Sequence, residues 1–126
     1  MDKTIGVSAS VHSTGASMHF SADGDNVATA VKATEGRVYG IELTNVNAAD
    51  AFIQLFDAVT TDVTVGTTTP SQSYLVPSGD GTLVGGMDKM FVVPLEFATA
   101  ITYACTSEIA GATDPTVGLT VNIIYK

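Results

Sequence analysis

The sequence is poor in cysteine, tryptophan and basic residues, and each shortage excludes something. Its 126 residues include one cysteine, no tryptophan, and five lysines and arginines against thirteen acidic residues. Because Cys105 is the only cysteine, no disulfide can form within the chain. The formal net charge of −8 disfavours direct binding to nucleic acid or to an anionic membrane, since both require basic side chains to neutralise phosphates. The basic residues are also too scattered in the sequence to predict a basic patch: they are Lys3, Lys32, Arg37, Lys89 and Lys126.

Long hydrophobic runs and export signals are missing as well. The sequence contains no run of 18 or more apolar residues, the length needed to span a bilayer, so we expect no membrane partner. The segment MDKTIGVSASVHSTG lacks the apolar core of a signal peptide, and no asparagine begins an Asn-x-Ser/Thr glycosylation sequon. We therefore expect the chain to be made in a cytoplasm without a general secretion signal.

Threonine and valine are abundant, with 18 and 15 residues, and their branched side chains favour β-strands over helices. Apolar and polar residues alternate in about eight short segments separated by turn residues, and no segment has a convincing helical pattern. This pattern predicts an all-β fold, an antiparallel β-sandwich that is jelly-roll-like. We expect residues 27–126 to form one sandwich domain. Residues 1–26 have weak periodicity and are expected to form an extended N-terminal arm or a loosely paired first strand.

The strand pattern around Pro94 carries two further expectations. Alternation places Phe91, Val93, Leu95 and Phe97 on one face of the same strand. Proline cannot donate a hydrogen bond to a neighbouring strand, so this strand is expected at a sheet edge or with a bulge. The segments VVPL and NII are apolar on both faces, which indicates burial against another subunit.

The candidate reactive residues do not form a recognisable catalytic or metal-binding motif. There is no Gly-x-Ser-x-Gly sequence, and His12 and His19 are expected as exposed residues of the arm. Residues 23–26, DGDN, resemble part of a calcium loop, but Val27 occupies the next ligand position, so a plain turn is favoured. Cys105 lies in an alternating apolar segment and is expected to be a buried, inert thiol.

Carboxylates could in principle support glycosidase chemistry, but Glu42, Asp57 and Glu96 do not stand out as a pair. A carbohydrate-binding groove usually presents tryptophan or tyrosine platforms, and here the tyrosines lie in strand patterns. We therefore predict no catalytic, cofactor-binding or metal-binding residues, and a protein that is not an enzyme.

One stretch carries a family resemblance. Residues 36–58, GRVYGIELTNVNAADAFIQLFDA, resemble small β proteins encoded in the structural gene clusters of tailed bacteriophages. These proteins share a Gly-Arg-hydrophobic-Tyr-Gly strand, an asparagine-containing turn, and a strand that ends in Gln-Leu-Phe/Tyr-Asp. The similarity extends over residues 32–126. The residues that match the shared pattern are expected to be structural: Arg37, Tyr39, Asn45, Gln54 and Asp57.

The resemblance implies a virion component, since similar small β-sandwiches serve as capsid decoration or cement proteins and are commonly trimers. We expect a protein on the capsid exterior that stabilises contacts between major capsid subunits and associates with copies of itself, as a homotrimer. The arm, residues 1–26, is expected to reach a neighbouring subunit. The alternative is a receptor-binding or adhesion module of a head or tail fibre.

Overall fold

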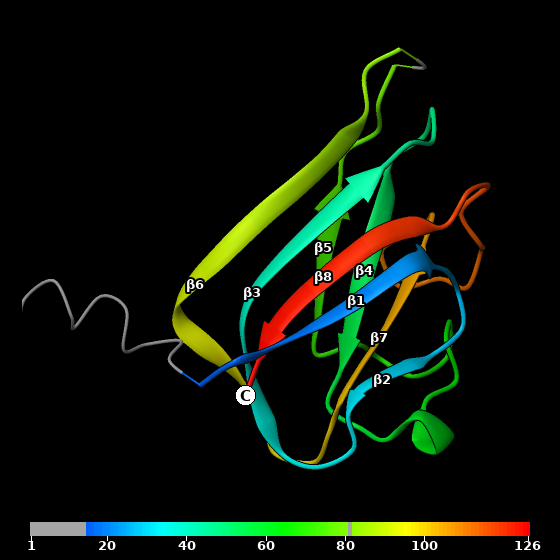
Figure 1. Ribbon diagram of the computed structural model, residues 1–126. Coiled ribbons are helices and arrows are strands. Elements are labelled where there is room, and N and C mark those ends of the chain that lie inside the picture. Colours follow the sequence, from blue (N-terminus) through cyan, green and yellow to red (C-terminus); the bar gives the residue numbers. More distant parts are fainter. Residues whose placement is uncertain (1–14, 81) are drawn as a thin grey trace, which may run out of the picture.

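The computed structural model describes residues 15–80 and 82–126, which form two four-stranded antiparallel sheets packed face to face (Figure 1). The sheet orders are β1-β8-β3-β6 and β2-β7-β4-β5, which is the strand order of a jelly roll. The prediction of an antiparallel, jelly-roll-like sandwich is therefore confirmed. The strands are β1 (Ser17–Gly24), β2 (Thr29–Lys32), β3 (Gly36–Asn45), β4 (Ala51–Phe56), β5 (Gln72–Val76), β6 (Gly85–Phe97), β7 (Ile101–Thr106) and β8 (Leu119–Tyr125), with a short 3-10 helix at Thr60–Asp62.

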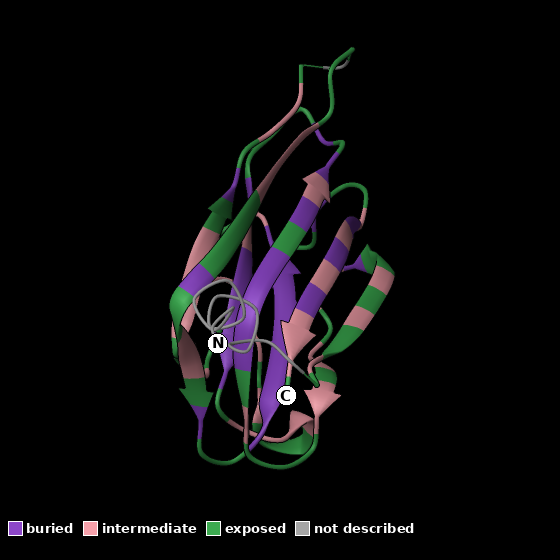
Figure 2. Cartoon of the chain, turned by 60° about the vertical axis from the view of Figure 1, so that its left-hand side comes forward, coloured by how far each residue is buried: buried purple, intermediate pink, exposed green. Residues whose placement is uncertain are grey.

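The hydrophobic core lies between the two sheets. Successive side chains of a strand point to opposite faces, so alternate residues of each strand meet in the middle. Ile41 and Leu43 of β3 pair with Ile123 and Val121 of β8, and all four side chains are buried. Figure 2 shows the buried residues concentrated in the central strands, with exposed residues at the edges and in the loops.

The outer face of the β2-β7-β4-β5 sheet is covered by the chain's own loops. All six residues of β7 are buried, as are Gln54 and Phe56 of β4. The Oγ1 of Thr102 donates a hydrogen bond of 2.6 Å to the carbonyl of Ala58, in the β4–β5 loop. The Nε2 of Gln54 donates one of 3.0 Å to the carbonyl of Gly111, in the β7–β8 loop. Among residues 15–80 and 82–126, no loop crosses the middle of the other sheet in this way.

Strand β6 is an edge strand and contains a large bulge at Pro94. Val38 of β3 pairs with Leu95, and Gly40 pairs with Met90, so four β6 residues lie opposite one residue of β3. The expectation of an edge strand or a bulge is confirmed. The bulge also breaks the alternation: Phe91 is buried, whereas Val93 is 76 % exposed, so the prediction that they share a face was wrong.

The N-terminal boundary predicted at residue 26 needs correction, because Ser17–Gly24 form β1 and pair with β8. Of the two interpretations of this segment, the paired first strand is right and the extended arm is wrong for these eight residues. The hydrophobic pattern was weak because β1 is an edge strand with mostly exposed side chains. Residues 1–14, the rest of the predicted arm, lie outside the described residues.

Candidate docking surface

The outer face of the β1-β8-β3-β6 sheet carries a row of apolar residues that crosses all four strands. Met18 of β1 pairs with Ile124 of β8, Ile124 pairs with Gly40 of β3, and Gly40 pairs with Met90 of β6. The neighbouring residues Ile41, Phe91 and Ile123 are buried in the core, so this row faces away from it. From here on, the outer face means this row of the β1-β8-β3-β6 sheet together with the row described next.

The next row of the outer face combines an aromatic ring with two carboxylates. Phe20 pairs with Asn122, Asn122 with Glu42, and Glu42 with Asp88. Directly opposite residues of an antiparallel pair have their Cβ atoms about 4.5–5.5 Å apart, so the side chains of Glu42 and Asp88 start side by side on this face.

A shallow hollow of about 240 Å³ lies where the two rows meet. Gly40, which lies between Ile124 and Met90 in the first row, has no side chain, and the sulfur of Met90 leans over it. A Cβ atom at position 40 would collide with that sulfur, so only glycine fits beneath the present Met90. The residues that line the hollow are Met18, Ile41, Glu42, Asp88, Met90, Asn122 and Ile124.

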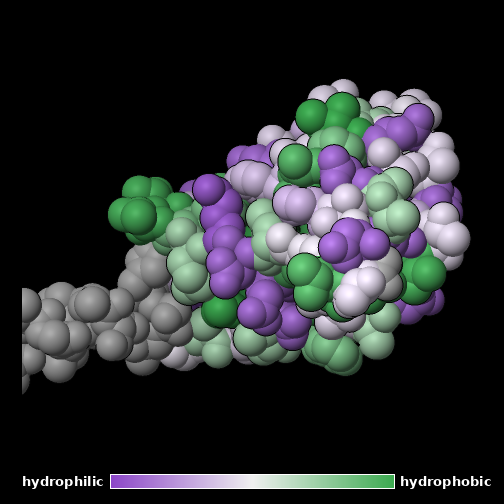
Figure 3. All heavy atoms as spheres, turned by 90° about the horizontal axis from the view of Figure 1, so that it is seen from above, coloured by the Kyte–Doolittle hydropathy of each residue, from purple (hydrophilic) through white to green (hydrophobic). Residues whose placement is uncertain are grey.

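The large apolar side chains of the outer face are accessible to water. Met18 is 58 % exposed, Phe20 is 61 % exposed and Met90 is 60 % exposed. Figure 3, which views the molecule from above and not straight onto the outer face, shows apolar groups interspersed with polar ones. Contiguous exposed apolar side chains on a small domain mark interaction sites, because burying them against a partner is favourable. This arrangement is suited to binding another protein.

Among the residues of the predicted motif, Asn45 is the centre of a hydrogen-bond network at one end of the sandwich. Its Nδ2 donates to the carbonyls of Ala49 and Val76, each at 3.1 Å, and its Oδ1 accepts from the backbone and side-chain nitrogens of Asn47. Asn47 exchanges two further hydrogen bonds with the backbone of Val117. The network joins the end of β3 to β5 and to the β7–β8 loop.

Asp57 and Gln54 fix loops in the same way. The carboxylate of Asp57 accepts hydrogen bonds from the backbone nitrogens of Ala98, Thr99 and Ala100 in the β6–β7 turn. Partial burial alone would raise the pKa of Asp57, but these three donors hold the pKa below its ordinary value. The Nε2 of Gln54 donates to Thr106 at 2.7 Å beneath the β7–β8 loop.

Arg37 and Tyr39 act at the other end of β3. The guanidinium of Arg37 lies 2.9 Å from the carboxylate of Glu96, on the neighbouring strand β6. The pKa of Arg37 is raised, first by its hydrogen bond to Glu96 and second by one to Tyr39. Like the contacts of Asn45, Gln54 and Asp57, these contacts join neighbouring strands and loops of this fold.

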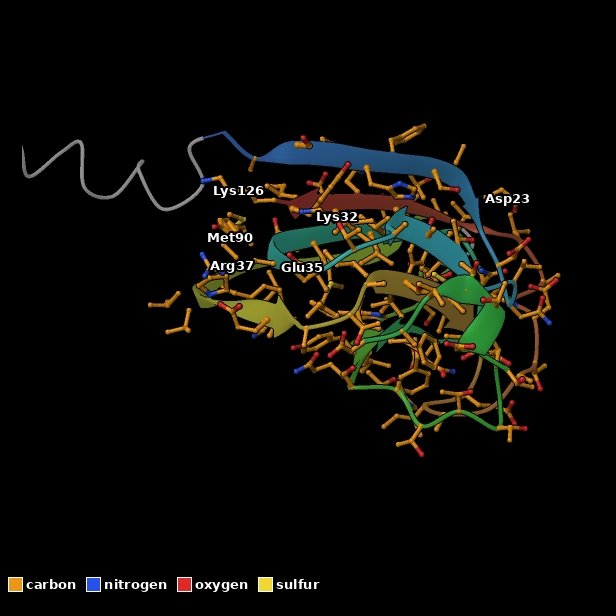
Figure 4. All side chains as sticks on the ribbon, turned by 90° about the horizontal axis from the view of Figure 1, so that it is seen from below. Asp23, Lys32, Glu35, Arg37, Met90 and Lys126 are labelled. Carbon is orange, nitrogen blue, oxygen red and sulfur yellow. The ribbon has the colours of Figure 1, made fainter. Side chains whose placement is uncertain are left out.

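The basic residues are gathered more closely than their spacing in the sequence suggests. Lys32, Arg37 and Lys126 line one open hollow together with Glu35 and Glu96. Figure 4 shows Lys32, Glu35, Arg37 and Lys126 at the same end of the sandwich. These three basic residues come together in the fold, although their spacing in the sequence did not suggest a patch, because the β2–β3 turn and the end of β8 meet there. Two carboxylates in the same place offset much of their charge.

Contrary to the expectation from the sequence, His19 is not an exposed residue of an arm. It lies on β1 on the core side, and its Nε2 is 3.1 Å from the hydroxyl of Tyr103 on the opposite sheet. The two rings meet edge to face, with centroids 5.3 Å apart. Burial lowers the pKa of His19, so the neutral imidazole is favoured in the fold. His12 lies outside the described residues.

Cys105 is a free, fully buried thiol, as predicted. Burial raises the pKa of Cys105 to about 12, which leaves the thiol protonated and unreactive at neutral pH. Asp25, from the DGDN segment, accepts a hydrogen bond of 3.0 Å from the backbone nitrogen of Val27 and closes the turn between β1 and β2. In residues 15–80 and 82–126, no three His, Cys, Asp or Glu side chains are close enough to hold a metal ion.

A larger hollow, of about 620 Å³, which we call the second hollow, lies at the end of the sandwich opposite to the basic residues. The β3–β4 and β7–β8 loops line it, and its polar side chains include Asp50, Ser107, Asp114 and Thr116. No aromatic side chain lines it. It is an open depression bounded mainly by small residues.

Two findings bear on the classification of the chain. No helix in the described part of the chain is long and apolar enough to cross a membrane. No protein-family model and no curated protein was found to match the sequence.

Proposed function

We propose that this chain is a capsid decoration, or cement, protein of a tailed bacteriophage. In this proposal it binds the capsid exterior through its outer face and stabilises contacts between major capsid subunits. The observation that supports docking is the contrast between the two sheets. The chain's own loops cover one sheet, whereas the other sheet presents Met18, Phe20 and Met90 to solvent.

The physical mechanism is burial of this apolar surface at the junction of capsid subunits. Removing an exposed methionine or phenylalanine side chain from water contributes on the order of 1–2 kcal/mol each. A protein that binds the assembled shell but not free subunits stabilises the shell by mass action. Many weakly bound copies therefore strengthen a particle without any chemical reaction.

For self-association, we propose the β6 edge as the contact between copies in a homotrimer. Val92 and Val93 protrude from the bulge and are 92 % and 76 % exposed. These valines follow Met90 on the same strand, so a contact there leaves most of the outer face free for the capsid. Trimerisation would multiply weak capsid contacts through avidity.

The test is to image particles that carry the protein and particles that lack it. The proposal expects extra density at regular positions on the capsid exterior and a copy number in the order of hundreds per particle. Density confined to the tail, or a few copies per particle, would contradict it. Removal of residues 2–14 tests the predicted arm without removing β1, and unchanged capsid occupancy would exclude a role for those residues.

The alternative proposal, a receptor-binding or adhesion module, would use the second hollow. Its carboxylates and hydroxyls, from Asp50, Asp114 and Ser107, could hydrogen-bond a glycan. Binding of the purified protein to a glycan array or to host cells, reduced by the substitution S107A or D114N, would support this alternative. The missing aromatic platform at this hollow makes decoration the preferred proposal.

A further inference from the structure

We propose that the hollow on the outer face receives an arginine or lysine side chain of the partner protein, flanked in the partner by apolar residues. The inference rests on the proposed docking of this face against another protein. The supporting observation is that carboxylates and apolar side chains together line one hollow.

The first observation is that two negative charges lie side by side on a sheet. Glu42 and Asp88 are directly opposite residues of β3 and β6, and both are exposed. Like charges in this position destabilise a sheet. A positive charge between the two carboxylates would relieve the repulsion.

The second observation is that no cation of the described residues supplies this positive charge. Lys89 follows Asp88 in β6 but points to the other face, where its Nζ lies 5.9 Å from the ring centroid of Phe91. Arg37 pairs with Glu96 at the end of the sheet. The acidic pair is therefore available to a charge from outside the described part of the chain.

The third observation is the apolar frame. Met18 and Ile124 line one side of the hollow and Met90 lines another, next to Glu42 and Asp88. Arginine and lysine have long aliphatic stems that pack on apolar surface while the charged end reaches a polar group. An arginine fits best, because its planar guanidinium can donate to two carboxylate groups at once.

The same charges argue against a second copy of this chain as the occupant. If two outer faces packed against each other across a twofold axis, the same patch would meet itself. With the axis close to the hollow, Glu42 and Asp88 of one copy would approach those of the other, and the repulsion would increase. A symmetric pair of outer faces is therefore disfavoured, and we assign the hollow to a different protein that presents a basic residue between apolar ones.

The test uses NMR titration of the full chain with two blocked peptides, Ac-Leu-Arg-Leu-NH2 and Ac-Leu-Gln-Leu-NH2. The inference expects the arginine peptide to shift the amide signals of residues around the hollow and to bind at least about tenfold more tightly than the glutamine peptide. The variant E42Q/D88N keeps the shape of the hollow and removes both charges, so this preference should disappear. The control E35Q/D62N removes two exposed carboxylates elsewhere and should keep the preference for the arginine peptide.

Several results would overturn the inference. Equal binding of the two peptides, unchanged binding by E42Q/D88N, or shifts confined to other acidic sites would each contradict it. Saturable binding of Mg²⁺ or Ca²⁺ in the hollow that displaces the arginine peptide would show a cation site in its place.

A capsid-binding assay separates this inference from the proposed function. If the wild-type protein and E42Q/D88N bind capsids equally at every salt concentration, decoration stands and the basic occupant is wrong. If the wild-type protein binds no capsid but selects the arginine peptide, the hollow's specificity stands and decoration is wrong.

Discussion

Met18 on β1 and Met90 on β6 lie in the same row of side chains, at opposite edges of the β1-β8-β3-β6 sheet, with Ile124 and Gly40 between them. Both methionines are exposed, and methionine adapts its shape readily to a binding partner. The relationship matters because these residues are 72 positions apart in the sequence and come together only through the pairing of four strands. The proposed docking surface is therefore a product of the fold.

The asparagine network predicts a large loss of stability on substitution of Asn45. The variant N45A removes the side-chain partners of Val76, Ala49 and Asn47 in a buried place, and unpaired buried polar groups are costly. We expect the free energy of unfolding to fall by about 2–4 kcal/mol. Chemical denaturation measures this loss.

The control for this prediction is N122A. Asn122 is half-buried on the outer face, and its side chain makes no hydrogen bond with another described residue. Its replacement should change the free energy of unfolding by less than about 1 kcal/mol. If N45A and N122A were equally mild, the network would not have the structural role that we assign to it.

His19 predicts a pH dependence of stability. Burial lowers its pKa in the folded state, so the unfolded chain binds a proton more readily than the folded one. Stability should therefore decrease as the pH falls from about 7.5 to about 5.5, through the ordinary pKa of histidine. Thermal unfolding across this range should show a smaller decrease for H19Q than for the wild-type protein. Parallel curves for the two proteins would mean that His19 does not cause the decrease.

The bulge in β6 predicts the effect of charge on self-association. The double variant V92D/V93D places two carboxylates where the proposed trimer contact requires apolar groups, and both side chains are exposed in the single chain. We expect sedimentation to show monomers for the variant and trimers for the wild-type protein, with similar circular dichroism spectra. A variant that remained trimeric would place the contact elsewhere on the molecule.

The sequence was sufficient to predict the fold class, because alternation and turn residues are local signals. Pro94 correctly indicated an edge strand with a bulge, since the missing backbone donor restricts where proline can lie. The side-chain direction after the bulge could not be predicted. The number of extra residues depends on how β6 pairs with β3, and Val93 consequently points to solvent.

The candidate site was not predictable in the same way. The hollow requires the register of β1, β8, β3 and β6 together, whereas the sequence indicates only alternation within each strand. The sequence signal of β1 was weak, because Met18 and Phe20 are its only large apolar residues and most of its side chains are exposed at the sheet edge. The β4–β5 and β7–β8 loops cover the outer side of the β2-β7-β4-β5 sheet. These loops have no periodic pattern, so the sequence does not indicate which sheet is covered.

The most direct test of the account is capsid occupancy by a variant of the docking surface. Purified protein is added to capsids that lack it, and the bound copies are counted for the wild-type protein, for M18D/M90D and for the control V27D/I109D. Val27 and Ile109 are also exposed apolar residues, but they lie in loops away from the outer face. The account predicts that M18D/M90D loses about tenfold or more in affinity while V27D/I109D binds like the wild-type protein. Equal occupancy by all three, with each protein folded, would contradict the proposal that this face binds the capsid.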